Sequence, residues 1–173
     1  MTDLPPARAI RRAPLDRVPC VRVPLAHHER VLRRRRLATD GGEAFLVDLP
    51  RTASIAHGDA FELADGRLIE AVAAEEALLE IRGDLARLAW HVGNRHAPCE
   101  VGDGWLRVAA DPVMARMLEG LGAEVRAIQA PFHPEGGAYG EGTPMGHSHG
   151  SHAHRPEESD DPLRLAGLAH DPR

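Results

Sequence analysis

The C-terminal end of this sequence holds four closely spaced histidines, in His147-Ser148-His149 and His152-Ala153-His154. Imidazole nitrogens bind divalent nickel, copper and zinc, and rings this close together can surround one ion. Only the neutral ring is a ligand, so binding must weaken as the pH falls through about 6.5. An expression tag is disfavoured because small residues alternate with the histidines and the chain continues to Arg173. The pattern therefore predicts metal binding and leaves the choice of metal open.

His91 and His96 form a second group, in the segment Trp90-His91-Val92-Gly93-Asn94-Arg95-His96. A spacing of five residues does not place two side chains on one face of a helix, which disfavours a single ion bound by both from one chain. A histidine near a helix end is more often a partner of the helix dipole than a metal ligand. The residues by themselves leave both roles open.

The other candidate ligands are isolated. Cys20 and Cys99 form no CxxC pair, so we expect free thiols rather than a disulfide or a thiolate zinc site. A Cys99 thiolate would also hold a metal too firmly for exchange. No second ligand lies at a useful spacing from His27, His28 or His57, which we expect to be solvated or turn residues.

Motifs of nucleophilic and nucleotide chemistry are missing from the sequence. It contains no GxxxxGK[ST] loop, no GxSxG elbow and no HExxH helix. A metalloenzyme that combines His91 and His96 with an acid such as Asp111 is the alternative, but it lacks a third ligand at a useful spacing. The sequence thus predicts a binding protein without catalytic residues rather than an enzyme.

All 21 basic residues are arginines, and a run of four occurs at Arg33-Arg34-Arg35-Arg36. A basic run can contact nucleic acid, but the net charge of −5 and the low aromatic content of 3% argue against that partner. We expect the arginines to lie on solvated strand faces, with an acidic protein surface as the second choice.

The expected secondary structure changes along the chain, from strands alone to strands combined with helices. This order predicts an α+β protein. Residues 1–74 contain short β-branched or alternating runs separated by glycine turns, typical of a small all-β domain. Residues 75–139 have the order of a ferredoxin-like βαββαβ domain. The expected strands of the two domains are Cys20–Val23, Ala44–Val47 and Arg67–Val72, then Leu78–Ile81, Cys99–Val101, Trp105–Val108 and Glu124–Ile128.

Two helices are expected within the second of these domains. Asp84 and Asp111 can cap their N-termini, and Pro112 suits the first position of the second helix. Gly93 and Gly122 are expected to end them.

The last segment, residues 140–173, is rich in Gly, Pro, Ser, His and acid and has no periodic apolar face, which predicts a disordered His-rich tail. No apolar run approaches the roughly 20 residues that span a bilayer. The N-terminal residues have no apolar signal core, so we expect a cytoplasmic protein without membrane contact.

Several segments resemble signatures of the UreE urease accessory proteins. The segment from Trp90 to His96 resembles the HLGNRH motif, and Pro131–Tyr139 resembles PFxPExGAY. Met117–Ala123 is similar to the ML..LGA helix end, and Leu49-Pro50-Arg51 followed by Gly58-Asp59 is similar to LPR…GD. The resemblance covers nearly the whole chain.

The resemblance implies a nickel metallochaperone, a homodimer that delivers the ion for assembly of the urease metallocentre. It implies a peptide-binding N-terminal domain, and as partners the urease apoprotein and its accessory proteins, including a GTPase. His96 then lies at the dimer two-fold axis and binds nickel with its symmetry mate, and zinc or copper are further candidate ions. His91 supports the site, His133 occupies a variable motif position, and the shell is completed by tail residues His147, His149, His152 and His154.

A site with one imidazole from each subunit suits a carrier, because it leaves ligand positions open for exchange. One departure from the family pattern concerns Asp111-Pro112-Val113-Met114, where the family often has Asp-His-Val-Leu. Any auxiliary site that uses this histidine is therefore missing. The alternative function is passive nickel storage, in which the tail does most of the binding.

Overall fold

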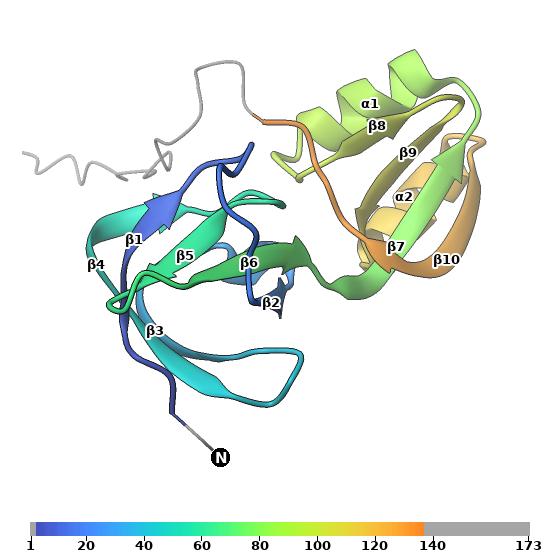
Figure 1. Cartoon of the computed structure of the whole chain (residues 1–173). Helices are drawn as coiled ribbons and strands as arrows, with labels where there is room; N and C mark the ends of the chain where they lie inside the picture. The colour runs from blue at the N-terminus through green and yellow to red at the C-terminus, as the bar shows by residue number, and fades with distance from the viewer. Residues whose placement is uncertain (1–2, 137–173) are drawn as a thin grey trace, which may run out of the picture.

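The computed structural model describes residues 3–136, whose strands form two sheets (Figure 1). The first sheet has the spatial order β2-β6-β5-β1-β4-β3, with parallel pairing only between β1 and β4 and between β2 and β6. A hydrogen bond from Asp40 N–H, in the turn after β3, to the Arg22 carbonyl of β2 links the two edges of this sheet, so the sheet curls toward a barrel. Its elements are β1 (Ala7–Arg11), β2 (Val21–Leu25), the short 3₁₀ helix η1 (His27–Glu29), β3 (Val31–Ala38), β4 (Ala44–Ser54), β5 (Ala60–Leu63) and β6 (Leu68–Ala73).

The interior of the first sheet is aliphatic, with two phenylalanines at its centre. Alternate residues of β4 point inward, as the period of a strand requires, and Phe45 and Val47 are fully buried. The Phe45 and Phe61 rings lie 5.7 Å apart between centroids in a tilted arrangement. This core is independent of the helices farther along the chain.

The arginine run lies in β3 between the buried residues Leu32 and Leu37, and all four arginines are exposed. Three of them form ion pairs, which are Arg34 with Asp48, Arg35 with Glu29, and Arg36 with Asp3. Exposed ion pairs contribute little stability, typically about 0–1 kcal/mol. The expectation of a solvated strand face is confirmed.

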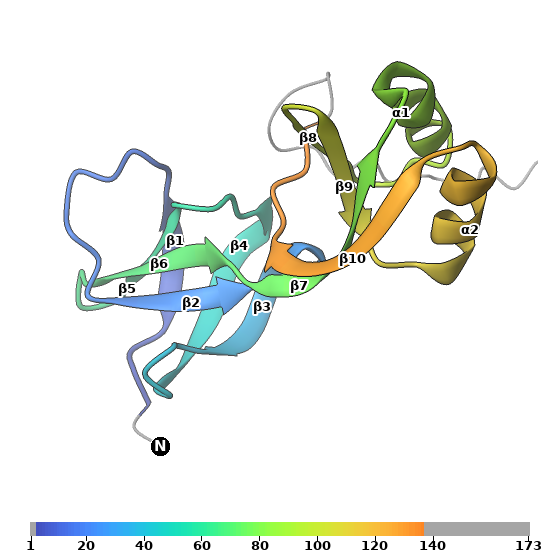
Figure 2. The same cartoon turned by 90° about the vertical axis from the view of Figure 1, so that its right-hand side faces the viewer.

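The second sheet is antiparallel, in the spatial order β10-β7-β9-β8, and both helices cover one side of it (Figure 2). Leu79, Ile81, Leu106 and Val108 point from the sheet toward the helices and pack with Leu88 and Leu118. The predicted α+β class is confirmed. The elements are β7 (Glu75–Arg82), α1 (Leu85–Gly93), β8 (Glu100–Gly102), β9 (Trp105–Ala109), α2 (Pro112–Gly120) and β10 (Glu124–Pro131).

Both helices begin as the sequence predicts. The Asp84 carboxylate accepts the Arg87 N–H at 3.3 Å, and the Asp111 carboxylate accepts the Met114 N–H at 2.6 Å. Such caps satisfy N–H groups that have no partner within the helix. Gly122, at a φ of +87°, follows the end of α2 in the left-handed conformation that glycine adopts easily.

The predicted tail, residues 140–173 with its four clustered histidines, lies outside the described residues. Within residues 3–136, neither helix is both long and apolar enough to cross a membrane.

Candidate functional site

His96 lies exposed on the turn that follows α1, and its N–H donates to the Gly93 carbonyl at 2.9 Å. Its φ of +54° is the only positive value among the non-glycine residues of the described chain. A left-handed backbone costs a residue with a Cβ atom about 1–2 kcal/mol, although histidine tolerates it better than most residues. Strain at an exposed turn, where glycine would fit more easily, is typical of a functional position.

Large apolar side chains are exposed on the two elements that flank this turn in the sequence. Trp90, on the last part of α1, is 65% exposed, and Val101, on β8, is 54% exposed. The partly buried His91 ring meets the Trp90 ring edge to face, with 4.9 Å between centroids. Tryptophan is enriched at protein contact surfaces.

The described residues do not contain a complete metal site. Within residues 3–136, no three His, Cys, Asp or Glu side chains gather closely enough to hold an ion. An ion bound at His96 would need further ligands from outside this part of the chain.

Both cysteines are free thiols, as expected. Burial raises the pKa of the Cys99 thiol, and the neighbouring carboxylates of Glu100 and Glu135 raise it further. Because thiolate is the metal-binding form, a raised pKa makes Cys99 a poor ligand at neutral pH.

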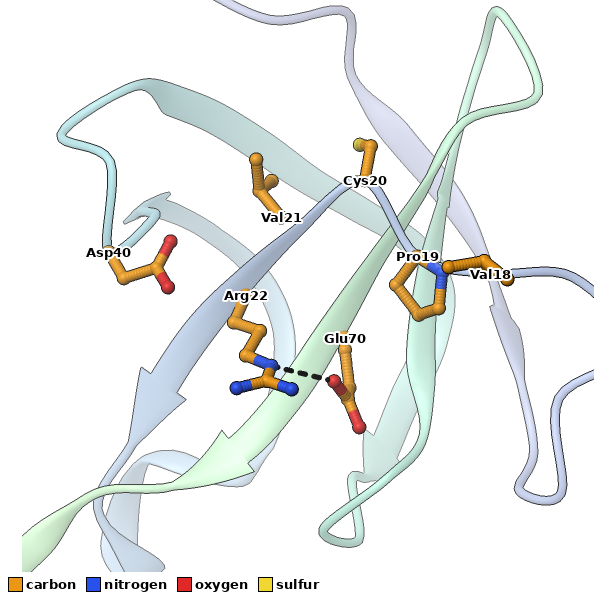
Figure 3. A pocket seen from close by; sticks show the side chains of 7 residues that line it. All are labelled: Val18, Pro19, Cys20, Val21, Arg22, Asp40 and Glu70. Carbon is orange, nitrogen blue, oxygen red and sulfur yellow. Dashed lines mark hydrogen bonds and ion pairs between the residues drawn. The ribbon is translucent and has the colours of Figure 1, made fainter.

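A hollow beside β2 contains the other cysteine (Figure 3). The Cys20 thiol donates to the Leu68 carbonyl at 3.2 Å, and Arg22 donates to Glu70 at 3.1 Å across the same region. A single thiol beside a formed ion pair offers no set of metal ligands. We assign no chemistry to this hollow.

A buried carboxylate lies on the side of the second sheet opposite the helices. Glu80 accepts hydrogen bonds from Arg107 at 2.9 Å and from Arg82 at 3.1 Å. The hydrogen bond from Arg107 is the main reason that the pKa of Glu80 is lowered. Arg107 also stacks over the Trp105 ring, 3.9 Å from its centroid. With its charge matched in this way, Glu80 is a structural residue.

The segment Phe132–Glu135, here called the strap, contacts both sheet units after β10. Phe132 is 1% exposed, and its carbonyl accepts a hydrogen bond from Arg30 Nη1 at 2.8 Å. On the other side, the Glu135 N–H donates to the Cys99 carbonyl at 2.8 Å. Figure 2 shows the strap running from β10 toward β8.

Two histidines of the first sheet unit lie against the strap. The His27 ring meets Phe132 edge to face at 5.4 Å between centroids, and His57 meets His133 at 4.9 Å. His57 Nδ1 accepts the Ala73 N–H at 3.1 Å, which places the ring proton on Nε2. That tautomer offers no free nitrogen lone pair to a metal, so we interpret His57 as a contact residue rather than a ligand.

The strap contacts predict acid sensitivity. Burial, with the nearby Arg30 charge, lowers the pKa of His27, and burial with His57 lowers the pKa of His133. Each ring then binds protons less readily in the folded than in the unfolded chain, so these rings favour folding above about pH 6.5. Their contribution is lost as the pH falls through the folded values. Urea unfolding of metal-free protein from pH 7.5 to 5 should show falling stability, and His27→Gln should flatten the slope.

No sequence pattern identified Arg30 as important. In the structure it is buried, with only 8% of its surface exposed. Its contact with Phe132 joins parts of the chain that no local pattern connects. A lone arginine after two histidines gives no signal of this role.

Comparison with known proteins assigns both parts of the chain. A family model described as UreE urease accessory protein, N-terminal domain, matches residues 4–74. The model of the C-terminal domain of the same family matches residues 74–158.

Individual relatives agree with these models. The urease accessory protein UreE of Ruegeria pomeroyi is 53% identical over 148 residues, which cover 85% of this chain and 99% of that protein. The protein of the same name from Cereibacter sphaeroides is 49% identical, over 87% of this chain and 83% of its own length. That of Paracoccus denitrificans is 51% identical, over 78% and 86% respectively.

Proposed function

Because this chain belongs to the UreE family of urease accessory proteins, we propose that it binds divalent nickel as a homodimer and delivers it for assembly of the urease metallocentre. As an accessory protein it takes part in urease maturation and is not itself an enzyme. The observation that carries the proposal is the exposed, strained His96 on the turn after α1.

One imidazole cannot hold an ion alone, so His96 requires its counterpart from a second copy. The exposed Trp90 and Val101 support a contact between copies on this side of the molecule. A bridging pair of imidazoles leaves other nickel positions to water or to mobile ligands, which favours release. His91 is proposed to support His96 through its contact with Trp90.

The tail histidines are proposed as the exchangeable ligands, namely His147, His149, His152 and His154. Zinc and copper suit the same donors and are expected competitors. The strand order β10-β7-β9-β8 supports a ferredoxin-like metal-binding domain in residues 75–139, after an N-terminal partner-binding domain in residues 1–74.

The proposed partners are the urease apoprotein and its other accessory proteins in the cytoplasm. The sequence has no phosphate-binding loop, so a GTPase among these proteins would supply the energy for insertion. The nine exposed arginines before residue 37 offer the first domain a surface for an acidic protein partner.

Deletion of residues 146–173 distinguishes the proposed carrier from the alternative, passive nickel storage. The four tail histidines are the feature that favours storage. A carrier should lose the tail-bound ions and keep about one nickel per dimer at His96, because the folded site remains. Equilibrium dialysis of the full and shortened chains measures this stoichiometry. Loss of nearly all bound nickel on deletion would favour storage instead.

A further inference from the structure

We propose that the strap is an acid-released latch between the two sheet units. At mildly acidic pH, protons taken up by His27 and, to a lesser extent, by His133 release Phe132 from Arg30, and the units reorient while both cores stay folded. This inference concerns the metal-free chain and does not depend on the proposed nickel function.

The two sheet units meet at a narrow junction. Their cores have no residue in common, and the only residue between the end of β6 and the beginning of β7 is Ala74. Phe132 is 1% exposed although it belongs to neither core, and its ring lies against His27 of the first unit. Figure 1 shows the strap running between the two units. Release of Phe132 would therefore leave the units connected through a short hinge at Ala74.

The latch is a buried guanidinium with an incomplete set of partners. Arg30 follows η1, where its Nε donates to the Leu25 carbonyl at 3.1 Å and its Nη1 donates to the Phe132 carbonyl at 2.8 Å. Its Nη2 lies 3.8 Å from the Glu76 carboxylate and, within residues 3–136, forms no hydrogen bond. Because a buried donor without a partner is costly, the closed latch is easier to open than a fully paired one.

His27 lies beside this buried cation. Its ring contacts Phe132 with 5.4 Å between centroids. Burial lowers the pKa of His27, and the Arg30 charge lowers it further. Glu76 opposes this shift in part, and His28 adds to it slightly. A proton on His27 would place a second charge beside a buried guanidinium, which a site of low dielectric disfavours.

His133, on the strap itself, acts in the same direction but is more exposed than His27. Its ring meets the His57 ring with 4.9 Å between centroids, and its N–H donates to Glu100 Oε2 at 3.2 Å. Partial burial and His57 lower the pKa of His133, and Arg30 adds to this, whereas the Glu100 carboxylate opposes it. Protonated rings at both positions would thus gather positive charge around Arg30.

Both shifts make the opening of the latch take up protons. A ring whose pKa is lower in the closed latch than in the open one binds a proton on opening, so the latch is tightest above about pH 6.5 and loosens as the pH falls. Between pH 7.5 and 5.5 each histidine can raise the opening constant by at most about tenfold. The other charges on these elements oppose this little, because Glu29 is engaged by Arg35 at 2.6 Å and Glu75 and Glu135 are exposed.

Amide hydrogen exchange in the full-length, metal-free chain tests the latch locally. The strap reporter is the Glu135 N–H, which bonds to the Cys99 carbonyl, and the core reporters are N–H groups of β4 and β9. After correction for the intrinsic pH dependence of exchange, the opening constant at Glu135 should rise about fivefold or more from pH 7.5 to 5.5. The core N–H groups should remain at least about 100-fold better protected at both pH values, because the strap opens without unfolding either core.

Residual dipolar couplings provide the second measurement, because they report the orientation of each unit. The two units should share one alignment at pH 7.5 and have different alignments at pH 5.5. A common alignment at both pH values would overturn the inference, as would core exchange as fast as that of Glu135.

Three variants show which groups take up the protons. In the double variant His27→Gln with His133→Gln, neither side chain binds a proton in this range, so the opening constant at Glu135 should change less than twofold between the two pH values. His28→Gln is the matched control, at the exposed neighbour of His27, and should respond like the parent. His133→Gln alone, at an exposed position, should reduce the response in part, which keeps the inference testable if the double variant loosens the strap. A full response in the double variant would overturn the inference.

Discussion

Replacement of His96 by glycine should abolish nickel binding by the protein that lacks residues 146–173 and should leave that protein folded. A symmetric dimer loses two imidazole ligands at once, so we expect affinity to fall on the order of 100-fold or more. Glycine adopts a φ of +54° without a Cβ clash, so stability should stay equal or rise by up to about 1 kcal/mol. Calorimetric titration and urea unfolding measure the two effects.

Two variants complete this experiment. His96→Ala should lose nickel equally and be less stable than His96→Gly, because alanine keeps the strained Cβ. His28→Ala removes another exposed histidine, from η1, and should bind nickel like the parent protein. Retention of full affinity by His96→Gly would refute a metal site at this turn.

The second large effect is expected at Trp90. Trp90→Glu places a charge on the 65% exposed apolar surface beside the His96 turn. A large aromatic residue in an interface typically contributes about 2 kcal/mol or more to binding. The dissociation constant of the dimer should therefore rise at least about 30-fold. Because each subunit supplies one His96, the monomer should also lose the nickel that survives tail deletion.

Sedimentation with and without nickel checks this result, with circular dichroism to verify folding. Val18→Glu is the matched control, since Val18 is 93% exposed in the first sheet unit. It should remain dimeric and bind nickel normally. A dimeric Trp90→Glu protein would place the contact between copies elsewhere.

Local chemistry allowed much of the second sheet unit to be predicted. Asp84 and Asp111 cap the helices because a carboxylate one position before a helix has free N–H groups to bond, whatever the rest of the fold. Periodic apolar residues identified the helix faces, and Leu88 and Leu118 are indeed buried. Motifs around His96 and Phe132 identified the family.

The first sheet unit was predicted less completely. β5 has only four residues, and β1 has two adjacent apolar residues, Ala9 and Ile10, so neither shows a clear alternating pattern. β3 could not be recognised from its sequence, because its four exposed arginines break the alternation expected of a half-buried strand. Its neighbours, rather than its own residues, make it a strand.

The strap could not be predicted, because its partners are distant in sequence. Phe132 is apolar enough to suggest burial, but nothing local indicates that Arg30 and His27 cover it. The conformation of His96 was also unexpected, since a left-handed histidine depends on the turn around it.

The contact between Arg30 and Phe132 joins residues 102 positions apart, whereas each sheet packs its own core from nearby segments. Contacts between distant residues form late in folding, because the chain entropy of closing a long loop must be overcome first. All strands of the first sheet precede residue 74, so that unit can mature on the ribosome before β10 has been synthesised. Docking of Phe132 is then the final event. A newly made chain passes through a stage in which both cores are formed but Phe132 has not yet bonded to Arg30.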